Sequence, residues 1–228
     1  MSPRGRAPRP ARPGRPSTTR AQRSGSGAAK RGAPAGRRAP DAAPASAPVE
    51  PLAPFRLTYV EGATPAKWIR AWNDRMPQRL EHELVAGEQQ LDALLAGEAD
   101  AAIVRLPVDA DDLHVVRLYD ERAFVVVPEE HAAADLDSVV AADLAQERTI
   151  ERGTMTWSEL VEVVASGAGI AVMPQSLARL HRRRDVASLP VDDLPPTTIA
   201  LAWRRERDGD DVQALVAITR GRSARSSR

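Results

Sequence analysis

The order of apolar and polar residues along the chain becomes regular at Phe55. Residues 55–60 alternate between the two kinds, which predicts a half-buried β-strand. A helix is expected next, with Thr64 as its N-cap and Pro65 at its first helical position. Its apolar residues recur at helical spacing and predict one buried face, made of Trp68, Ile69, Trp72 and Met76. Both tryptophans are therefore expected in the core rather than on a recognition surface.

The same periodicities predict strands and helices as far as residue 219. Strands are expected at 80–85, 101–106, 113–119, 123–127, 170–173, near 186 and at 197–203. Helices are expected at 89–96, at 137–146, from 156, from 175 and at 210–219. The first should turn Leu91, Leu94 and Leu95 inward, and the third opens on a capping box of Thr156 and Glu159. Strands that alternate with helices indicate an α/β fold with a largely parallel sheet.

The first 54 residues have a different composition. They are rich in Pro, Arg, Ala, Gly and Ser and contain no aromatic residue. Such a segment buries too little apolar surface to offset the entropy of ordering it, which predicts a disordered arm. Residues 1–40 hold 11 basic residues and no acidic one, which leaves 21 of the 32 basic residues against all 31 acidic residues. A basic arm is thus joined to an acidic body, and the arm is suited to polyanions.

Two stretches of the arm come close to the Arg-Gly-Arg-Pro core of AT-hook minor-groove binders. They lie at 3–8 and 12–16, and their candidate DNA contacts are Arg4, Arg6, Arg12 and Arg15. Neither copy is complete, since Ala7 stands where a proline is expected and the second copy lacks the Arg-Gly order. Three interpretations stay open: minor-groove recognition, nonspecific attraction to phosphates, and an inert solubilising tail.

Several classes of protein are excluded by what the sequence lacks. Without cysteine there is no disulfide scaffold, thiolate zinc site or cysteine nucleophile. No apolar run of about 18 residues and no signal peptide occur, so a cytoplasmic protein with no membrane partner is expected. The four histidines lack the spacing of a metal site, and neither a nucleophile elbow nor a phosphate-binding loop is present. We expect no enzyme, no metal and no cofactor.

Residues 55–222 resemble the effector-binding (substrate-binding) domain of LysR-type transcriptional regulators. The resemblance is carried by FRLTYVEGATPAKW at 55–68, LLAGEADAAIVRLP at 94–107, VVASGAGIAVMPQS at 163–176 and ITRGR at 218–222. It implies a two-lobed, periplasmic-binding-protein-like (type 2) α/β domain that holds a small effector in the cleft between its lobes. Lobe I is then expected at about 55–126 and 197–222 and lobe II at about 127–196, and 223–228 form a basic tail.

The resemblance also implies where the chain crosses between the lobes and where it departs from the family. The crossings are expected near 127–128 and near 195–196. The family places a winged helix-turn-helix and a linker helix before this domain, whereas the 54 residues here are rich in Pro and Arg. Residues 147–153 are short for the second lobe, so one wall of the cleft is expected to be open.

Two predicted helix starts supply candidate effector contacts. The N–H groups of a helix beginning at Thr64 and Pro65 can hold an anion, and the family holds ligand carboxylates at this position. Thr64 serving only as a cap is the alternative. Thr154 and Thr156 precede the helix of the second lobe and could face Thr64 across the cleft, or Thr156 could serve the capping box alone.

A further set of candidates follows the buried strand at 101–106. Arg105, Leu106 and Pro107 lie where open α/β sheets bind ligands, at the carboxyl end of a strand. The Arg105 guanidinium is suited to a bidentate bond with a carboxylate. Its alternative role is a surface ion pair with a nearby aspartate. Pro174 and Gln175 are weaker candidates for the same cleft.

The expected function is effector sensing with a part in transcriptional regulation. The expected partners are a small anionic effector such as a carboxylate, DNA through the basic arm, and a second copy of the chain or another regulator. Two alternatives remain: a solute-binding protein with no role at DNA, and an interaction protein that keeps the fold without a ligand.

Overall fold

The computed structural model describes residues 52–109 and 111–221, which belong to one unit. Its strands form two sheets, and we call the part around each sheet a lobe. The candidate DNA contacts in the arm and the basic tail at 223–228 lie outside the described residues. None of the helices in the described part is long and apolar enough to cross a membrane.

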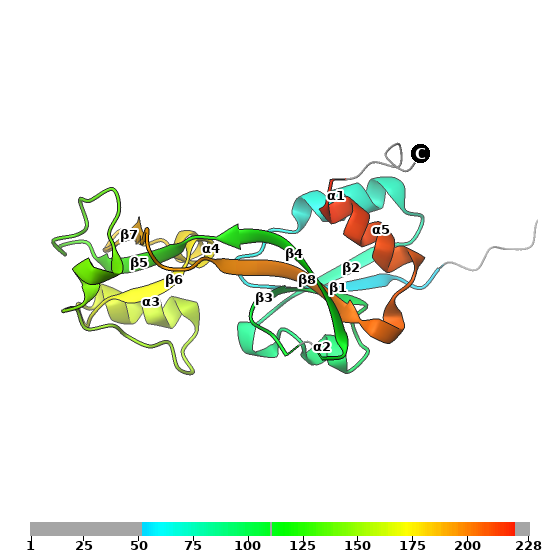
Figure 1. The fold of residues 1–228 in the computed structure, drawn as a ribbon, viewed down its shortest axis with the longest axis horizontal. Helices are drawn as coiled ribbons and strands as arrows, with labels where there is room; N and C mark the ends of the chain where they lie inside the picture. The colour runs from blue at the N-terminus through cyan, green and yellow to red at the C-terminus, as the bar shows by residue number, and fades with distance from the viewer. Residues whose placement is uncertain (1–51, 110, 222–228) are drawn as a thin grey trace, which may run out of the picture. The chain divides into compact units, whose positions relative to one another are not determined.

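Lobe I is built on a five-stranded sheet in the order β2-β1-β3-β8-β4 (Figure 1). Its strands are β1 (Phe55–Val60), β2 (Leu80–Val85), β3 (Ala101–Arg105), β4 (Leu113–Glu121) and β8 (Thr197–Arg204). β1 pairs in parallel with β2 and β3, whereas β8 runs antiparallel to β3 and β4. The prediction of a largely parallel sheet is therefore wrong. A continuous apolar run shows that a strand is buried but does not reveal the direction of its neighbours.

The helices of lobe I cover both faces of this sheet. Helices α1 (Ala66–Arg75) and α5 (Asp210–Thr219) lie on one face and the short α2 (Asp92–Leu95) on the other (Figure 1). Trp68 and Trp72 of α1 are buried, as predicted, and the Trp72 ring lies 4.6 Å from that of Phe55. This core packs α1 against β1.

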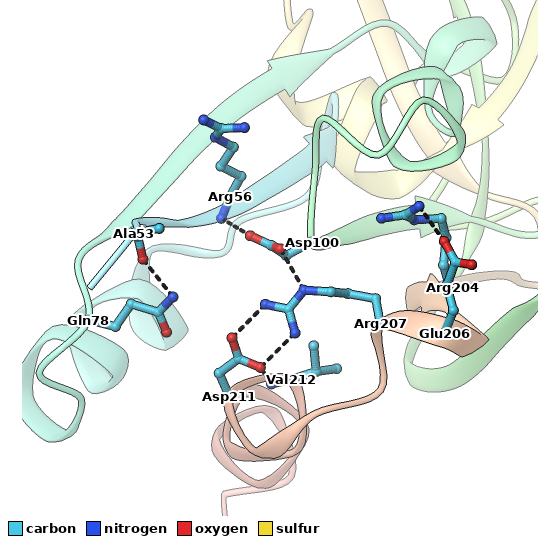
Figure 2. A network of polar contacts seen from close by, with 9 residues as sticks. All are labelled: Ala53, Arg56, Gln78, Asp100, Arg204, Glu206, Arg207, Asp211 and Val212. Carbon is cyan, nitrogen blue, oxygen red and sulfur yellow. Dashed lines mark hydrogen bonds and ion pairs between the residues drawn. The ribbon is translucent and has the colours of Figure 1, made fainter. Parts of the chain in front are cut away.

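Arg207 joins three segments of lobe I (Figure 2). Its Nε donates to Asp100 at 2.7 Å, and its two terminal nitrogens donate to the two carboxylate oxygens of Asp211 at 2.9 and 2.5 Å. The other oxygen of Asp100 accepts the Arg56 backbone N–H at 2.7 Å. The network fastens the start of β1 and the turn before β3 to the start of α5.

Lobe II is built on an antiparallel three-stranded sheet in the order β6-β5-β7. Its strands are β5 (Ala123–Pro128), β6 (Ala171–Pro174) and β7 (Val186–Pro190). Helices α3 (Trp157–Ala165) and α4 (Gln175–Leu180) pack against this sheet. Single bridges add Val139 beside Val191 and Thr149 beside Ile170, so Thr149 in the short 147–153 segment pairs with the residue before β6.

The first crossing between the lobes lies at Arg122, earlier than the predicted 127–128. β4 ends at Glu121 in the sheet of lobe I, and β5 begins at Ala123 in the sheet of lobe II. When one residue separates two strands, their hydrophobic patterns run together. The pattern therefore does not show that the two strands belong to different sheets. The return falls between β7 and β8, where 195–196 was predicted.

Two predicted helices are shorter in the structure. The helix expected at 89–96 is a 3-10 turn at Gly87–Gln89 followed by the one-turn α2, and the one at 137–146 is a 3-10 turn at Ala141–Leu144. Leu94 is buried as predicted, but Leu95 is 58% exposed. A helix of one turn buries only a narrow stripe, so two successive leucines do not both face the sheet.

Candidate functional site

A cleft of about 690 Å³ is lined by both lobes. This volume suits a small organic molecule, because ligand pockets commonly measure about 300–1,000 Å³. Lobe I contributes the end of β1, the start of α1 and the end of β4, and lobe II contributes α4. The lining residues are Tyr59, Glu61, Gly62, Ala63, Thr64, Lys67, Trp68, Leu84, Tyr119, Asp120 and Glu121 from lobe I, with Gln175, Ser176, Arg179 and Leu180 from lobe II.

Arg105 lies beneath the cleft and contacts both lobes. Its Nη2 is 3.1 Å from the Glu121 carboxylate, and the two side chains are only 13% and 4% exposed. The same nitrogen donates to the Glu61 carbonyl at 3.1 Å and to Ser176 Oγ of α4 at 3.4 Å. Gly62, with φ +86°, permits this approach, since a Cβ there would collide with Ser176 Oγ.

Two more polar contacts connect the lobes. His181, which caps the end of α4, lies 2.8 Å from the Glu61 carboxylate. Arg152 of lobe II pairs with Glu88 of lobe I. The lobes are thus joined by several polar contacts.

The charged residues of the cleft divide into paired carboxylates and unpaired cations. Glu61 is held by His181 and Glu121 by Arg105, while Asp120 accepts from Thr198 at 2.6 Å and Arg117 at 3.0 Å. These hydrogen bonds, the one from Thr198 first, lower the pKa of Asp120. Within residues 52–109 and 111–221, no carboxylate lies within 4.0 Å of the charged nitrogens of Lys67 or Arg179.

Aromatic side chains form part of the apolar lining of the cleft, together with Leu84 and Leu180. The Trp68 and Tyr119 ring centroids are 6.4 Å apart, and Lys67 Nζ lies 4.8 Å from the Trp68 ring centroid. Burial and then the charge of Glu121 raise the pKa of Tyr119, while Arg105 and the Thr64 backbone oppose the rise. Tyr119 therefore stays a neutral hydroxyl at physiological pH.

Thr64 lines the cleft, but it does not cap α1 as predicted. Pro65 occupies the N-cap, and no side chain hydrogen-bonds that cap. Pro65 has helical angles, φ −74° and ψ −4°, and its carbonyl accepts the N–H groups of Trp68 and Ile69. The hydrogen-bond ladder therefore starts at Pro65, and Thr64 stands one residue outside it with an exposed side chain.

Of the other predicted contacts, Gln175 lines the same cleft and Arg105 lies beneath it, whereas the rest do not gather around Thr64. Leu106 and Pro107 line a separate hollow of about 620 Å³ beside residues 195–198. Thr154 and Thr156 line neither hollow. The Thr156 capping box is confirmed: its Oγ1 accepts from the Glu159 N–H at 3.2 Å, and its own N–H donates to the Glu159 carboxylate at 2.7 Å.

Lys67, Tyr119 and Arg179 were not singled out from the sequence. Lys67 could have been identified from its position three residues after Thr64, because residues at this spacing lie on the same side of a helix. Arg179 and Tyr119 enter the cleft because α4 and β4 end there, in different lobes. That meeting depends on the crossing at Arg122, which no local pattern reveals.

Comparisons with known proteins agree with this architecture. The family model described as the LysR substrate binding domain matches residues 63–158 and 152–224, more than half of the chain. A comparison with curated protein sequences finds no match.

Several solved structures share the fold. The effector binding domain of BenM with its effector benzoate matches at 20% identity and a TM-score of 0.62, covering 75% of this chain and 92% of that one. The reduced OxyR regulatory domain from Pseudomonas aeruginosa matches at 22% identity and 0.58, covering 74% and 93%. Full-length BenM matches at 20% identity and 0.61, covering 74% of this chain and 66% of that one. By its family match and its two-lobed fold, the chain belongs to the LysR substrate-binding-domain family.

Proposed function

We propose that this chain senses a small anionic effector in the cleft between its lobes and takes part in transcriptional regulation. In this proposal the protein acts in the cytoplasm and catalyses no reaction. The effector is a small carboxylate whose negative group meets Lys67 and Arg179 near Thr64 and Pro65. Trp68 and Tyr119 contact its organic part.

The observation that carries the proposal is the state of the charges in the cleft. Each carboxylate already has a partner, whereas Lys67 and Arg179 have no carboxylate partner among the described residues. An anion between the lobes would gain charge-assisted hydrogen bonds without displacing an existing ion pair. A cation would find no unpaired carboxylate in this lining.

Two further features support a ligand with an organic body. The Trp68 and Tyr119 rings line the same cleft as the two cations. BenM, whose effector-binding domain has the same fold, takes benzoate as its effector. Benzoate is therefore a suitable first probe for this cleft.

A thermal-shift panel tests the charge of the ligand. Benzoate and other small carboxylates are compared with benzamide, which is neutral, and benzylamine, which is cationic. We expect at least one carboxylate to raise Tm by about 5–10 °C at about 100 times its Kd, and its neutral and cationic counterparts to have no effect. No shift with any carboxylate would favour an interaction protein without a ligand, and a shift with benzylamine would contradict an anionic effector.

We also propose that the basic arm supplies the contact with DNA. The support is its 11 basic residues in the first 40 and its two near-matches to a minor-groove motif. A mobility-shift assay compares the full chain with a variant in which Arg4, Arg6, Arg12 and Arg15 are glutamine. The matched control replaces Arg20, Arg23, Arg31 and Arg37 with glutamine as well.

The outcomes of this assay separate three roles of the arm. Loss of binding to A·T-rich duplexes only in the first variant supports minor-groove contact through the two motifs. Equal weakening in both variants, with a steep salt dependence, supports nonspecific phosphate binding. If the unaltered chain does not shift DNA at low salt, the arm makes no contact with DNA and the proposal fails.

A further inference from the structure

Lobe II carries a second hollow, apart from the cleft. It measures about 1,010 Å³ and lies between the end of α4, the start of β7 and the loop after β5. Its apolar surface comes from Phe124, Ala178 and Val186. Its charged lining consists of Arg179, Arg182, Arg183 and Arg184, with Glu129 and Asp135.

Most of these charges have no partner of opposite charge among the described residues. Arg183 is bound by Asp185, at 2.9 and 2.8 Å, and lies 3.7 Å from Glu162. In the part of the chain that the structure describes, Arg182 and Arg184 have no carboxylate within 4.0 Å, and Glu129 and Asp135 have no cation within that distance. Arginines and carboxylates thus line one hollow without neutralising each other.

The backbone that presents these residues is held in place. Pro128 at the end of β5 pairs with Val186 of β7, and the Glu129 N–H donates to the Asp185 carbonyl at 3.1 Å. The bidentate bond between Arg183 and Asp185 fixes the arginine run further. A concave surface with fixed walls is suited to a small molecule rather than to the side of a duplex.

We propose that this hollow binds a small phosphate monoester whose organic part carries hydroxyl or amino groups. Arg182 and Arg184 bind the phosphate, because the planar guanidinium matches its oxygens and a monoester carries nearly two negative charges. The carboxylates of Glu129 and Asp135 accept hydrogen bonds from the hydroxyl or amino groups. The ring of Phe124 contacts the apolar part of the ligand.

Calorimetric titration of the full chain tests the site, with glucose 6-phosphate as the probe and inorganic phosphate and glucose as its two parts. Arg179 also lines the cleft, so the variant changes only residues of the hollow: Arg182→Gln with Arg184→Gln. The control, Arg70→Gln with Arg148→Gln, removes the same charge from exposed positions outside the hollow. Both variants keep the basic arm, and circular dichroism checks their fold.

We expect glucose 6-phosphate to bind more tightly than either of its parts. The hollow variant should lose at least about tenfold in affinity, since two charge-assisted hydrogen-bonding groups are removed, and the control less than twofold. Equal losses in the two variants, or inorganic phosphate binding as tightly as the ester, would overturn the proposal. Failure of the ester to bind at millimolar concentrations, with duplex DNA binding lost in the hollow variant alone, would assign the surface to nucleic acid instead.

Discussion

Arg105 is the residue on which the polar floor of the cleft depends. Its guanidinium contacts the Glu121 carboxylate, the Glu61 carbonyl and Ser176 Oγ, so one side chain connects β3 with β4 and with α4 of the other lobe. Its Nε and Nη2 groups are therefore engaged within the protein. We expect Arg105 to position the cleft rather than to hold the effector directly.

Replacing Arg105 should destabilise the protein. In Arg105→Ala the carboxylate of Glu121, whose side chain is 4% exposed, loses its cation, and the free energy of unfolding should fall by about 3–5 kcal/mol. Urea unfolding measures the change. Arg105→Met combined with Glu121→Leu should recover most of the loss because no charge is then left buried. A loss below about 1 kcal/mol in the single variant would contradict this role.

The Arg207 network of Figure 2 gives a prediction about acid stability. Hydrogen bonds from Arg207 lower the pKa of Asp211 in the folded protein. A carboxylate with a lowered folded pKa stabilises the fold above its unfolded pKa of about 3.9, and this contribution is lost as the pH falls through the folded pKa. Asp211→Asn should therefore cost about 2 kcal/mol at pH 7 and progressively less below about pH 4.

Urea unfolding at several pH values measures this difference. Asp210→Asn is the matched control, because it removes the neighbouring carboxylate without touching the pair with Arg207. A difference between wild type and Asp211→Asn that stays constant from pH 7 to pH 3 would contradict the assigned cause.

At the scale of elements, the start of α3 shows whether Thr156 has a structural role or a ligand-binding role. Thr156 and Glu159 satisfy each other's backbone N–H groups, and Thr156 does not line the cleft. Thr156→Ala should therefore cost about 1 kcal/mol of stability and leave the affinity for a carboxylate effector unchanged. Thermal unfolding and calorimetry measure the two quantities. Weaker effector binding without a loss of stability would return Thr156 to the candidate contacts.

Elements with a strong local pattern were predictable from the sequence. The alternation at 55–60 gave β1 with its bounds, and the capping box at Thr156 gave the start of α3. The one-turn helices and the direction of β8 were not predictable in this way. Both depend on contacts with segments far along the chain, which override local propensity.

The residues of the site were predictable only where neighbouring residues in the sequence mark them. Thr64 was found because a Thr-Pro pair marks a helix start, and it lines the cleft. Arg179 and Tyr119 come from elements whose meeting depends on the chain crossing at Arg122. Leu106 and Pro107 follow β3 as expected, but β8 runs antiparallel beside it and they line the hollow next to 195–198 instead.

At the scale of the whole molecule, the cleft is bounded by contacts that satisfy its acidic groups. Arg105 with Ser176 and His181 with Glu61 connect the lobes at the cleft, and Arg152 with Glu88 connects them outside its lining. Two connections, at Arg122 and between β7 and β8, carry the chain across. The charged groups of the cleft that have no partner of opposite charge among the described residues are the cations Lys67 and Arg179. We therefore expect the ligand of the cleft to be an anion.

The most direct test of this account is a calorimetric titration of benzoate, or of the best carboxylate from the thermal panel, into three forms of the full chain. They are the unaltered protein, Lys67→Gln with Arg179→Gln, and the control Arg70→Gln with Arg148→Gln outside the cleft. We predict one site per chain, an affinity at least about tenfold weaker in the cleft variant, and less than a twofold change in the control. Equal affinity in all three forms would show that the anion binds elsewhere and would contradict an effector site between the lobes.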